Sequence, residues 1–126
     1  MTILLLEPDQ WLAELYTRIL RDEGHKVIPV MHAQSAIDWI DDNGLVDLII
    51  LELLLGEHNG LEFINELRSH HDWITIPLVV QTTVPPTQHL LSTEDWRQLG
   101  VISYLYKPMT KLTDLVRVVR QSQPVS

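Results

Sequence analysis

The sequence has no cysteine and few basic residues. Without cysteine the chain forms no disulfide, thiolate metal site or cysteine nucleophile, and it suits a reducing compartment, so we expect a cytoplasmic protein. Nine Lys and Arg against 17 Asp and Glu give a net charge of −8. Because this charge repels the phosphates of nucleic acids and anionic membrane surfaces, we expect neither as a partner.

The sequence also has no apolar run long enough to span a membrane. The apolar N-terminal segment ends at Leu6, and Glu7 follows at once without a basic leader. This segment is too short for a signal peptide or a membrane span, and we interpret it as a first strand. We find no repeat, linker or low-complexity segment in the 126 residues. We therefore expect one domain over residues 1–122 and a frayed C-terminal tail over residues 123–126.

The apolar residues that are present predict alternating strands and helices. Strands are expected at 3–6, 26–30, 46–52, 77–81 and 101–106. Helices are expected at 9–23, 33–42, 59–70, 88–99 and 110–121, with a break near Ser92 as an alternative in the fourth. This order is typical of an α/β protein with a flavodoxin-like (βα)5 fold. We predict a doubly wound, five-stranded parallel sheet with strand order 2-1-3-4-5.

The third predicted strand contains the apolar run Leu48–Leu51, without alternation, which favours a strand covered on both faces. Its last residue is Glu52. The carboxyl ends of parallel strands meet at one edge of the sheet, where ligands bind. The polar residues at that edge are Glu7, Asp9, Glu52, Thr82 and Lys107. Together they predict an acidic cleft with a hydroxyl and an ammonium at its rim.

Four segments carry a resemblance to a known family. They are Leu4–Asp9, Asp47–Glu52 with Asn59-Gly60, Pro77–Thr82, and Tyr104–Pro108. Over roughly residues 2–121 the chain resembles the receiver domain of bacterial two-component response regulators. In that family, two acids after the first strand and an aspartate ending the third bind Mg²⁺, and a histidine kinase phosphorylates the aspartate.

The resemblance assigns roles to individual residues. Thr82 and Lys107 match the residues that contact the phosphoryl group, and Tyr104 occupies the switch-aromatic position. The Lys107–Pro108 peptide bond is expected to be cis by the same resemblance. In responsive members the segment after Thr82 moves when the phosphoryl group arrives. Here this segment contains Pro85 and Pro86, which stiffen it.

Two positions depart from the family pattern. Glu52 stands where the family has its phosphoacceptor aspartate, and Pro8 replaces the second acid, usually a direct metal ligand. Mg²⁺ needs near-octahedral oxygen ligands, which proline does not offer. The extra methylene of Glu52 moves its carboxylate by about 1 Å, a misplacement that can cost about a hundredfold in rate. We predict a degenerate, or pseudo-, receiver with weak or absent Mg²⁺ binding, no other cofactor and no enzyme activity.

Each of these residues also has a purely structural interpretation. Asp9 can cap the helix that follows it. Thr82 can be a turn hydroxyl. Lys107 can form an ion pair with Glu52 or Glu7 that only offsets repulsion in an acidic cleft. The pair His70-His71 is interpreted as part of a solvated loop.

Four apolar or aromatic residues point to a partner surface. Trp96, Tyr104, Tyr106 and Met109 belong to the face formed by segments 88–99, 101–106 and 110–121, which the family uses for partners. Exposed aromatics there would mark an interface, and burial in the core is the alternative. The expected partner is a histidine kinase or another signalling protein, with a homodimer as an alternative.

Three functions compete. The leading hypothesis is a stand-alone pseudo-receiver that signals through protein–protein contacts without phosphorylation; in one version Glu52 imitates the phosphorylated aspartate. The second is a phosphorelay receiver that a histidine kinase still modifies slowly. The third is a flavodoxin-like FMN-binding protein, although its first loop, Glu7 to Gln10, is acidic and would repel phosphate.

Overall fold

Five parallel strands form the central sheet, in the order β2-β1-β3-β6-β7. The computed structural model describes residues 1–56, 58–88 and 91–123. The strands are β1 (Thr2–Leu6), β2 (Lys26–Val30), β3 (Leu48–Leu51), β6 (Leu78–Thr82) and β7 (Val101–Tyr106). Counted along the chain, this is the predicted order 2-1-3-4-5, and the flavodoxin-like prediction is confirmed.

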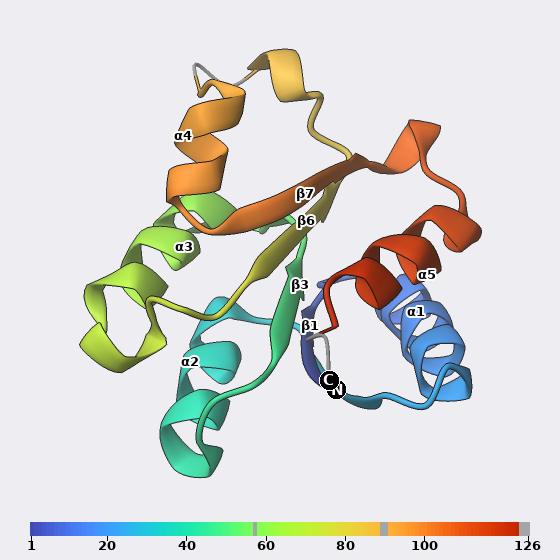
Figure 1. Ribbon diagram of the computed structural model, residues 1–126, viewed down its shortest axis with the longest axis horizontal. Helices are drawn as coiled ribbons and strands as arrows, with labels where there is room; N and C mark the ends of the chain where they lie inside the picture. The colour runs from blue at the N-terminus through green and yellow to red at the C-terminus, as the bar shows by residue number, and fades with distance from the viewer. Residues whose placement is uncertain (57, 89–90, 124–126) are drawn as a thin grey trace.

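Helices cover both faces of the sheet (Figure 1). On one face lie α1 (Gln10–Asp22) and α5 (Leu112–Gln121). On the other lie α2 (Ala33–Asn43), α3 (Gly60–Ser69) and α4 (Thr93–Gln98). Three short 3₁₀ turns, η1 (His71–Trp73), η2 (Pro86–Gln88) and η3 (Lys107–Met109), lie in the connections. None of the described helices has the length and apolar character needed to cross a membrane.

The sheet is apolar on both faces because both are covered by helices. In β1, Leu4 and Leu6 join the core beneath α2, α3 and α4, whereas Ile3 and Leu5 join the core beneath α1 and α5. Residues of β3 divide between the same two cores and are all buried. The two cores explain why the third strand is an unbroken apolar run, without the alternation of a half-exposed strand.

Strand register brings the polar residues at the carboxyl ends together. Leu6 of β1 pairs with Leu51 of β3, and the residues that follow them are Glu7 and Glu52. Thr82 of β6 pairs with Tyr106 of β7, and Lys107 follows Tyr106. The edge of the sheet therefore carries two acids after the adjacent strands β1 and β3 and a base after β7, as the sequence predicts.

The edge strand β2 contains a proline without disturbing the sheet. The N–H of Lys26 bonds to Met1 O at 2.9 Å, so the even-numbered amides of β2 point toward β1. Pro29, which has no N–H, is at a position whose amide would point toward the free edge. No hydrogen bond of the sheet is lost.

The region after β3 differs from the prediction. The strand ends at Leu51 rather than at 52, and a short antiparallel hairpin follows, made of β4 (Leu54–Leu55) and β5 (His58–Asn59). Asn59 then caps α3, its side-chain oxygen accepting the N–H groups of Leu61 and Glu62 at 2.7 and 3.2 Å. The hairpin was not predicted because two-residue strands carry too little periodicity.

The predicted helix over 88–99 is wrong in its first part. Helix α4 begins only at Thr93, because Ser92 and Asp95 form a capping box with reciprocal bonds of 2.8 and 3.1 Å. The break considered near Ser92 is therefore the start of the helix. Residues 89–90 of this prediction, and 124–126 of the predicted tail, lie outside the described part of the chain.

The expected cis peptide bond is also wrong. The Lys107–Pro108 bond is trans. Pro108 lies in the first turn of η3, where its fixed φ and missing N–H are tolerated.

The close packing around Gly60, the first residue of α3, leads to a prediction about the stability of the fold. A Cβ at this position would lie 2.7 Å from Leu53 Cα and 2.8 Å from Leu53 Cδ2. Overpacking costs about 1–3 kcal/mol, and the better helix propensity of alanine returns at most about 1 kcal/mol. We expect Gly60→Ala to lower the free energy of unfolding, measured by urea denaturation, by about 1–2 kcal/mol. Asn65→Ala, on the exposed side of the same helix, should change it by less than about 0.5 kcal/mol; equal effects would contradict this account.

Candidate functional site

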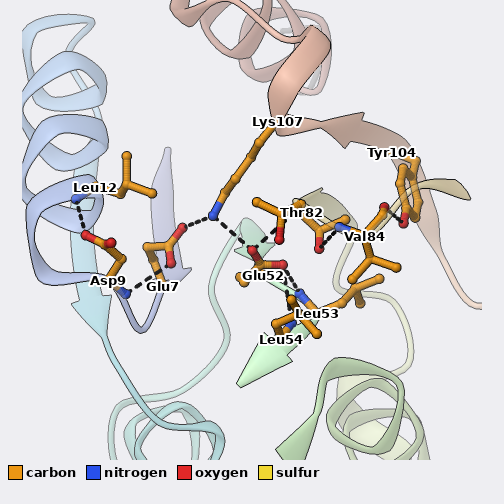
Figure 2. Close-up of polar contacts among 11 residues, drawn as sticks. Glu7, Asp9, Leu12, Glu52, Leu53, Leu54, Thr82, Val84, Tyr104 and Lys107 are labelled. Atoms are coloured by element: carbon orange, nitrogen blue, oxygen red, sulfur yellow. Dashed lines mark hydrogen bonds and ion pairs between the residues drawn. The ribbon is translucent and has the colours of Figure 1, made fainter. Parts of the chain in front are cut away.

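A buried lysine joins two buried glutamates at the carboxyl edge of the sheet (Figure 2). Lys107 Nζ lies 2.6 Å from Glu7 Oε1 and 3.0 Å from Glu52 Oε1. The side chains are 12%, 4% and 5% exposed, respectively. Charge-assisted hydrogen bonds of this length offset part of the large cost of burying three charges. The sequence predicts a pair between Lys107 and Glu52 or Glu7, and the structure contains both.

Glu52 is held by backbone donors as well as by Lys107. Its Oε2 accepts the N–H groups of Leu53 at 2.6 Å and Leu54 at 3.2 Å. Its Oε1, besides Lys107, accepts the N–H of Thr83 at 3.4 Å. Each carboxylate oxygen therefore has two donors, which come from the loops after β3, β6 and β7. The carboxylate connects three loops of the site.

Asp9 turns away from this cluster. Its Oδ1 accepts the N–H of Leu12 at 3.0 Å and caps α1, and its own N–H donates to Glu7 Oε2 at 3.2 Å. The helix-cap interpretation of Asp9 therefore describes its observed contacts. Between Glu7 and Asp9, Pro8 offers no side-chain oxygen.

These residues do not fit the Mg²⁺ ion that the family resemblance implies. A magnesium site needs several carboxylate or carbonyl oxygens in octahedral geometry. Here Lys107 Nζ lies between the two glutamates, and Asp9 bonds to its own helix. Among the described residues no group of three or more His, Asp or Glu is arranged to hold a metal. The cation between the acids is an ammonium.

The loop after β6 links the cluster to an aromatic side chain. Thr82 is fully buried, and its Oγ1 accepts the N–H of Val84 at 3.1 Å, as a turn hydroxyl does. The hydroxyl of Tyr104 donates to the carbonyl of Val84 at 2.6 Å. Thr83, which bonds to Glu52, and Val84, which bonds to Tyr104, are consecutive. Two successive residues thus connect the carboxylate to the aromatic ring.

The buried charges and rings have shifted proton affinities. Burial alone would lower the pKa of Lys107, but hydrogen bonds to Glu7 and Glu52 and their charges outweigh it, and the pKa of Lys107 is raised. Burial raises the pKa of Tyr104 to about 12, and the charge of Glu52 adds to the effect. Burial also raises the pKa of Tyr16 on α1, with smaller contributions of both signs from the cluster. At neutral pH the lysine is charged and both phenols are neutral.

The predicted partner surface is only partly exposed. Trp96 is 7% exposed and packs edge-on against Tyr104, with ring centroids 5.3 Å apart, which is the burial considered as the alternative for it. Tyr104 and Tyr106 are partly buried, and Met109 is 80% exposed. A groove of about 280 Å³ lies between α4 and β7, next to Trp96 and Tyr104. The aromatic pair supports the wall of this groove from inside.

Sequence reasoning missed the backbone part of the site. The N–H groups of Leu53, Leu54 and Thr83 and the carbonyl of Val84 hold the two functional side chains. Every residue except proline has such groups, so no residue type announces them. The electrostatic effect of the site's charges on Tyr16 was also missed, because the helical spacing of this residue identifies it only as a packing residue.

The raised pKa of Tyr104 predicts a pH dependence. The phenol ionises at its ordinary value of 10.0 when unfolded but only at about 12 when folded. Its contribution to stability is therefore full below pH 10.0 and is lost as the pH rises toward 12. In Tyr104→Phe, urea denaturation should show a smaller stability loss over this pH range than in the unsubstituted chain. At neutral pH the variant should lose about 1 kcal/mol with the bond to Val84. Tyr106→Phe is the matched control, and an unchanged alkaline slope in Tyr104→Phe would contradict the prediction.

Comparison with known proteins agrees with this architecture. The family model described as "Response regulator receiver domain" matches residues 3–120. The transcriptional regulatory protein CpxR of Escherichia coli K12 is 29% identical over 92% of this chain and 47% of its own length. The alginate biosynthesis transcriptional regulatory protein AlgB of Pseudomonas aeruginosa is 29% identical over 84% of this chain and 22% of its own length. The chain thus spans about half, or less, of these curated relatives.

Comparison with solved structures shows the same fold. A two-component response regulator from Clostridium difficile superposes with a TM-score of 0.81, at 25% identity, over 97% of this chain and 94% of its own. The sequence match extends from Ile3 in β1 to Arg120 in α5 and so includes residues of every strand of the sheet. This chain therefore belongs to the response regulator receiver domain family.

Proposed function

We propose that residues 1–122 act as a phosphorylation-independent receiver module, in which Glu52 imitates the phosphorylated aspartate of ordinary family members. The proposal rests chiefly on one observation, the four donors that surround the Glu52 carboxylate. One of them is Lys107, the residue whose counterpart in the family contacts the phosphoryl group. Another is Thr83, in the segment that moves in responsive members.

The contacts beyond Glu52 support an imitating rather than an inert acid. The carboxylate bonds to Thr83, and the adjacent Val84 bonds to Tyr104 at the switch-aromatic position. An acid that reached only Lys107 would neutralise charge without fixing the loop. Here the acid and the ring hold the same loop at two adjacent residues, which favours one fixed loop conformation over an exchange between two.

Lys107 supports independence from metal. Phosphoryl transfer in this family uses Mg²⁺ to position and neutralise the reacting groups. Pro8 removes an oxygen ligand, and the ammonium of Lys107 already bridges Glu7 and Glu52. In this proposal the lysine is the permanent counter-ion of the site, and the module does not act as an enzyme.

The proposed output is binding of a signalling protein, such as a histidine kinase, through the face formed by α4, β7 and α5. The groove beside Trp96 and Tyr104 and the exposed Met109 lie on this face. The curated relatives named above are transcriptional regulators. An FMN-binding function receives no support, because the loop after β1 carries the buried acid Glu7 where a phosphate would have to sit.

Phosphorylation gives the first test. We expect no species heavier by one phosphoryl group when the chain is incubated with a small-molecule phosphodonor and Mg²⁺ and its intact mass is measured. Glu52→Asp alone should also remain unmodified, because the metal ligand at Pro8 is still missing. Glu52→Asp combined with Pro8→Asp restores both family positions and should be modified. A phosphorylated form of the natural chain that disappears in Glu52→Gln would favour the slow phosphorelay instead.

The imitation of a phosphorylated state has a separate test. Glu52→Gln keeps the side-chain size but removes the charge that Lys107 and Thr83 bind. A hydrogen bond to a charged group contributes about 1.5–3 kcal/mol, so amide exchange at Thr83 and in the following loop should accelerate by about tenfold. Hydrogen exchange measured by NMR gives this rate residue by residue. Glu62→Gln, exposed on α3, is the control. Equal exchange rates in Glu52→Gln and the unsubstituted chain would mean that Glu52 is inert.

A further inference from the structure

Among the described residues, the side chain of Arg68, near the carboxyl end of α3, bonds only to backbone carbonyl groups. Its Nε donates to Leu99 O at 2.8 Å, its Nη1 to Trp73 O at 2.9 Å and its Nη2 to Ile76 O at 2.7 Å. None of the ion pairs between described residues includes this arginine. A charged donor forms stronger hydrogen bonds than a neutral one. The guanidinium therefore joins three segments that lie apart in the sequence, namely the end of α4, the end of η1 and the connection to β6.

The carboxyl end of α4 is fixed at two consecutive residues. Leu99 is the C-cap of the helix, and its carbonyl is the one that Arg68 Nε binds. The carbonyl of Gly100 accepts the N–H of Leu78, the first residue of β6, at 3.0 Å. Gly100 also has a φ of +81°, and a Cβ at this position would collide with Arg68 Nη2. A residue with a side chain would displace the guanidinium, so glycine permits the contact. This end of α4 is held against both α3 and the sheet.

The amino end of α4 is attached differently. Its capping box is closed within the helix, because the N–H of Ser92 donates to Asp95 Oδ2 and the N–H of Asp95 donates to Ser92 Oγ. Within the described part of the chain, neither of these side chains bonds to another element. The amino end is connected to the sheet by the packing of Trp96 against Tyr104 and by the loop after β6, which Tyr104 holds at Val84. One end of the helix is thus bonded to the framework, and the other follows the loop.

The groove of about 280 Å³ beside α4 is lined from both ends of this helix. The chain enters α4 from the loop after β6 and leaves it directly into β7 (Figure 1). The lining residues from the loop and the start of the helix are Pro86, Leu91 and Thr93, and those next to its carboxyl end are Arg97, Val101 and Ile102. The second group flanks the fixed positions 99 and 100. The groove therefore has one end that is fixed and one end that depends on the loop.

We propose that α4 is hinged at its carboxyl end, with Arg68 as the fixed point. The groove then changes width at the end lined by Pro86 and Thr93 and keeps its width beside Arg97. Six helical residues span about 9 Å, so a rotation of about 15° about the carboxyl end moves the amino end by roughly 2 Å. Packed contacts respond to size differences of a single methylene, so this displacement decides which side chain fits the groove. The proposal concerns which end of α4 moves, and it does not depend on whether Glu52 imitates a phosphorylated aspartate.

The first half of the test loosens the fixed end. Arg68→Lys keeps the charge but has one nitrogen in place of three, so it cannot bind all three carbonyls. Exchange of the amide protons of Leu99 and Gly100, measured by NMR, should accelerate by at least about tenfold. The amides of Asp95 and Trp96 report on the amino end, and their exchange should change by less than about twofold.

The second half of the test loosens the loop. Tyr104→Phe removes the hydrogen bond to the carbonyl of Val84. Exchange at the two amides of the amino end should accelerate by about fivefold, because one neutral hydrogen bond is lost. The two amides of the carboxyl end should change by less than about twofold, since the bonds of Arg68 remain.

A matched control separates the hinge from a general loss of stability. Arg97→Lys changes an exposed arginine of the same helix, whose ion pair with Glu94 stays within that helix. It should alter exchange at neither end by more than about twofold. The proposal is overturned if Arg68→Lys or Tyr104→Phe accelerates exchange equally at both ends, because α4 then opens as one unit. It is also overturned if either variant leaves both ends unchanged.

A second measurement decides the question if Arg68→Lys does not fold. The chain has no cysteine, so spin labels can be attached at introduced cysteines alone. One labelled pair is Glu14→Cys with Thr93→Cys, the other is Glu14→Cys with Gln98→Cys, and all three positions are exposed. When Tyr104→Phe is added, pulsed electron paramagnetic resonance should show a broader or shifted distance distribution for the pair with position 93 and an unchanged one for the pair with position 98. Equal changes in both pairs overturn the hinge.

Discussion

The ammonium of Lys107, buried between Glu7 and Glu52, is the interaction on which the site depends. Two carboxylates on adjacent strands, both nearly buried, would repel each other strongly in an environment of low dielectric constant. The lysine comes from the far side of the sheet, one residue after the end of β7. It therefore fixes the ends of β1, β3 and β7 relative to one another. The cation that joins these strand ends is the side chain of Lys107.

The conformation of the loops after β3 and β6 depends on this ion cluster. Besides Lys107, the ionised carboxylate of Glu52 accepts backbone N–H groups from two loops. The second of these loops reaches Tyr104 through Val84. Tyr104 packs against Trp96, which is part of the core beneath α4. A continuous set of contacts thus runs from the carboxyl edge of the sheet to the face formed by α4 and β7.

Residue patterns predicted the features that depend on long, regular segments. The apolar run before Glu52 indicated a doubly covered strand, and strand order with register then placed Glu7, Glu52 and Lys107 together. The start of α4 was misplaced because the capping box at Ser92 decides it locally. The cis bond before Pro108 was expected only by resemblance, and Trp96 was judged from sequence position without knowledge of its packing against Tyr104. Backbone donors to Glu52 are invisible in any sequence, since they depend on loop conformation.

The edge strand β2 limits how this molecule can assemble. Two of its outward backbone groups are not open to a partner strand, since Pro29 has no N–H to offer and the carbonyl of Val27 is occupied by Arg21. These two features disfavour extension of the sheet by hydrogen bonding along β2, which is the usual route to open-ended aggregation of sheet proteins.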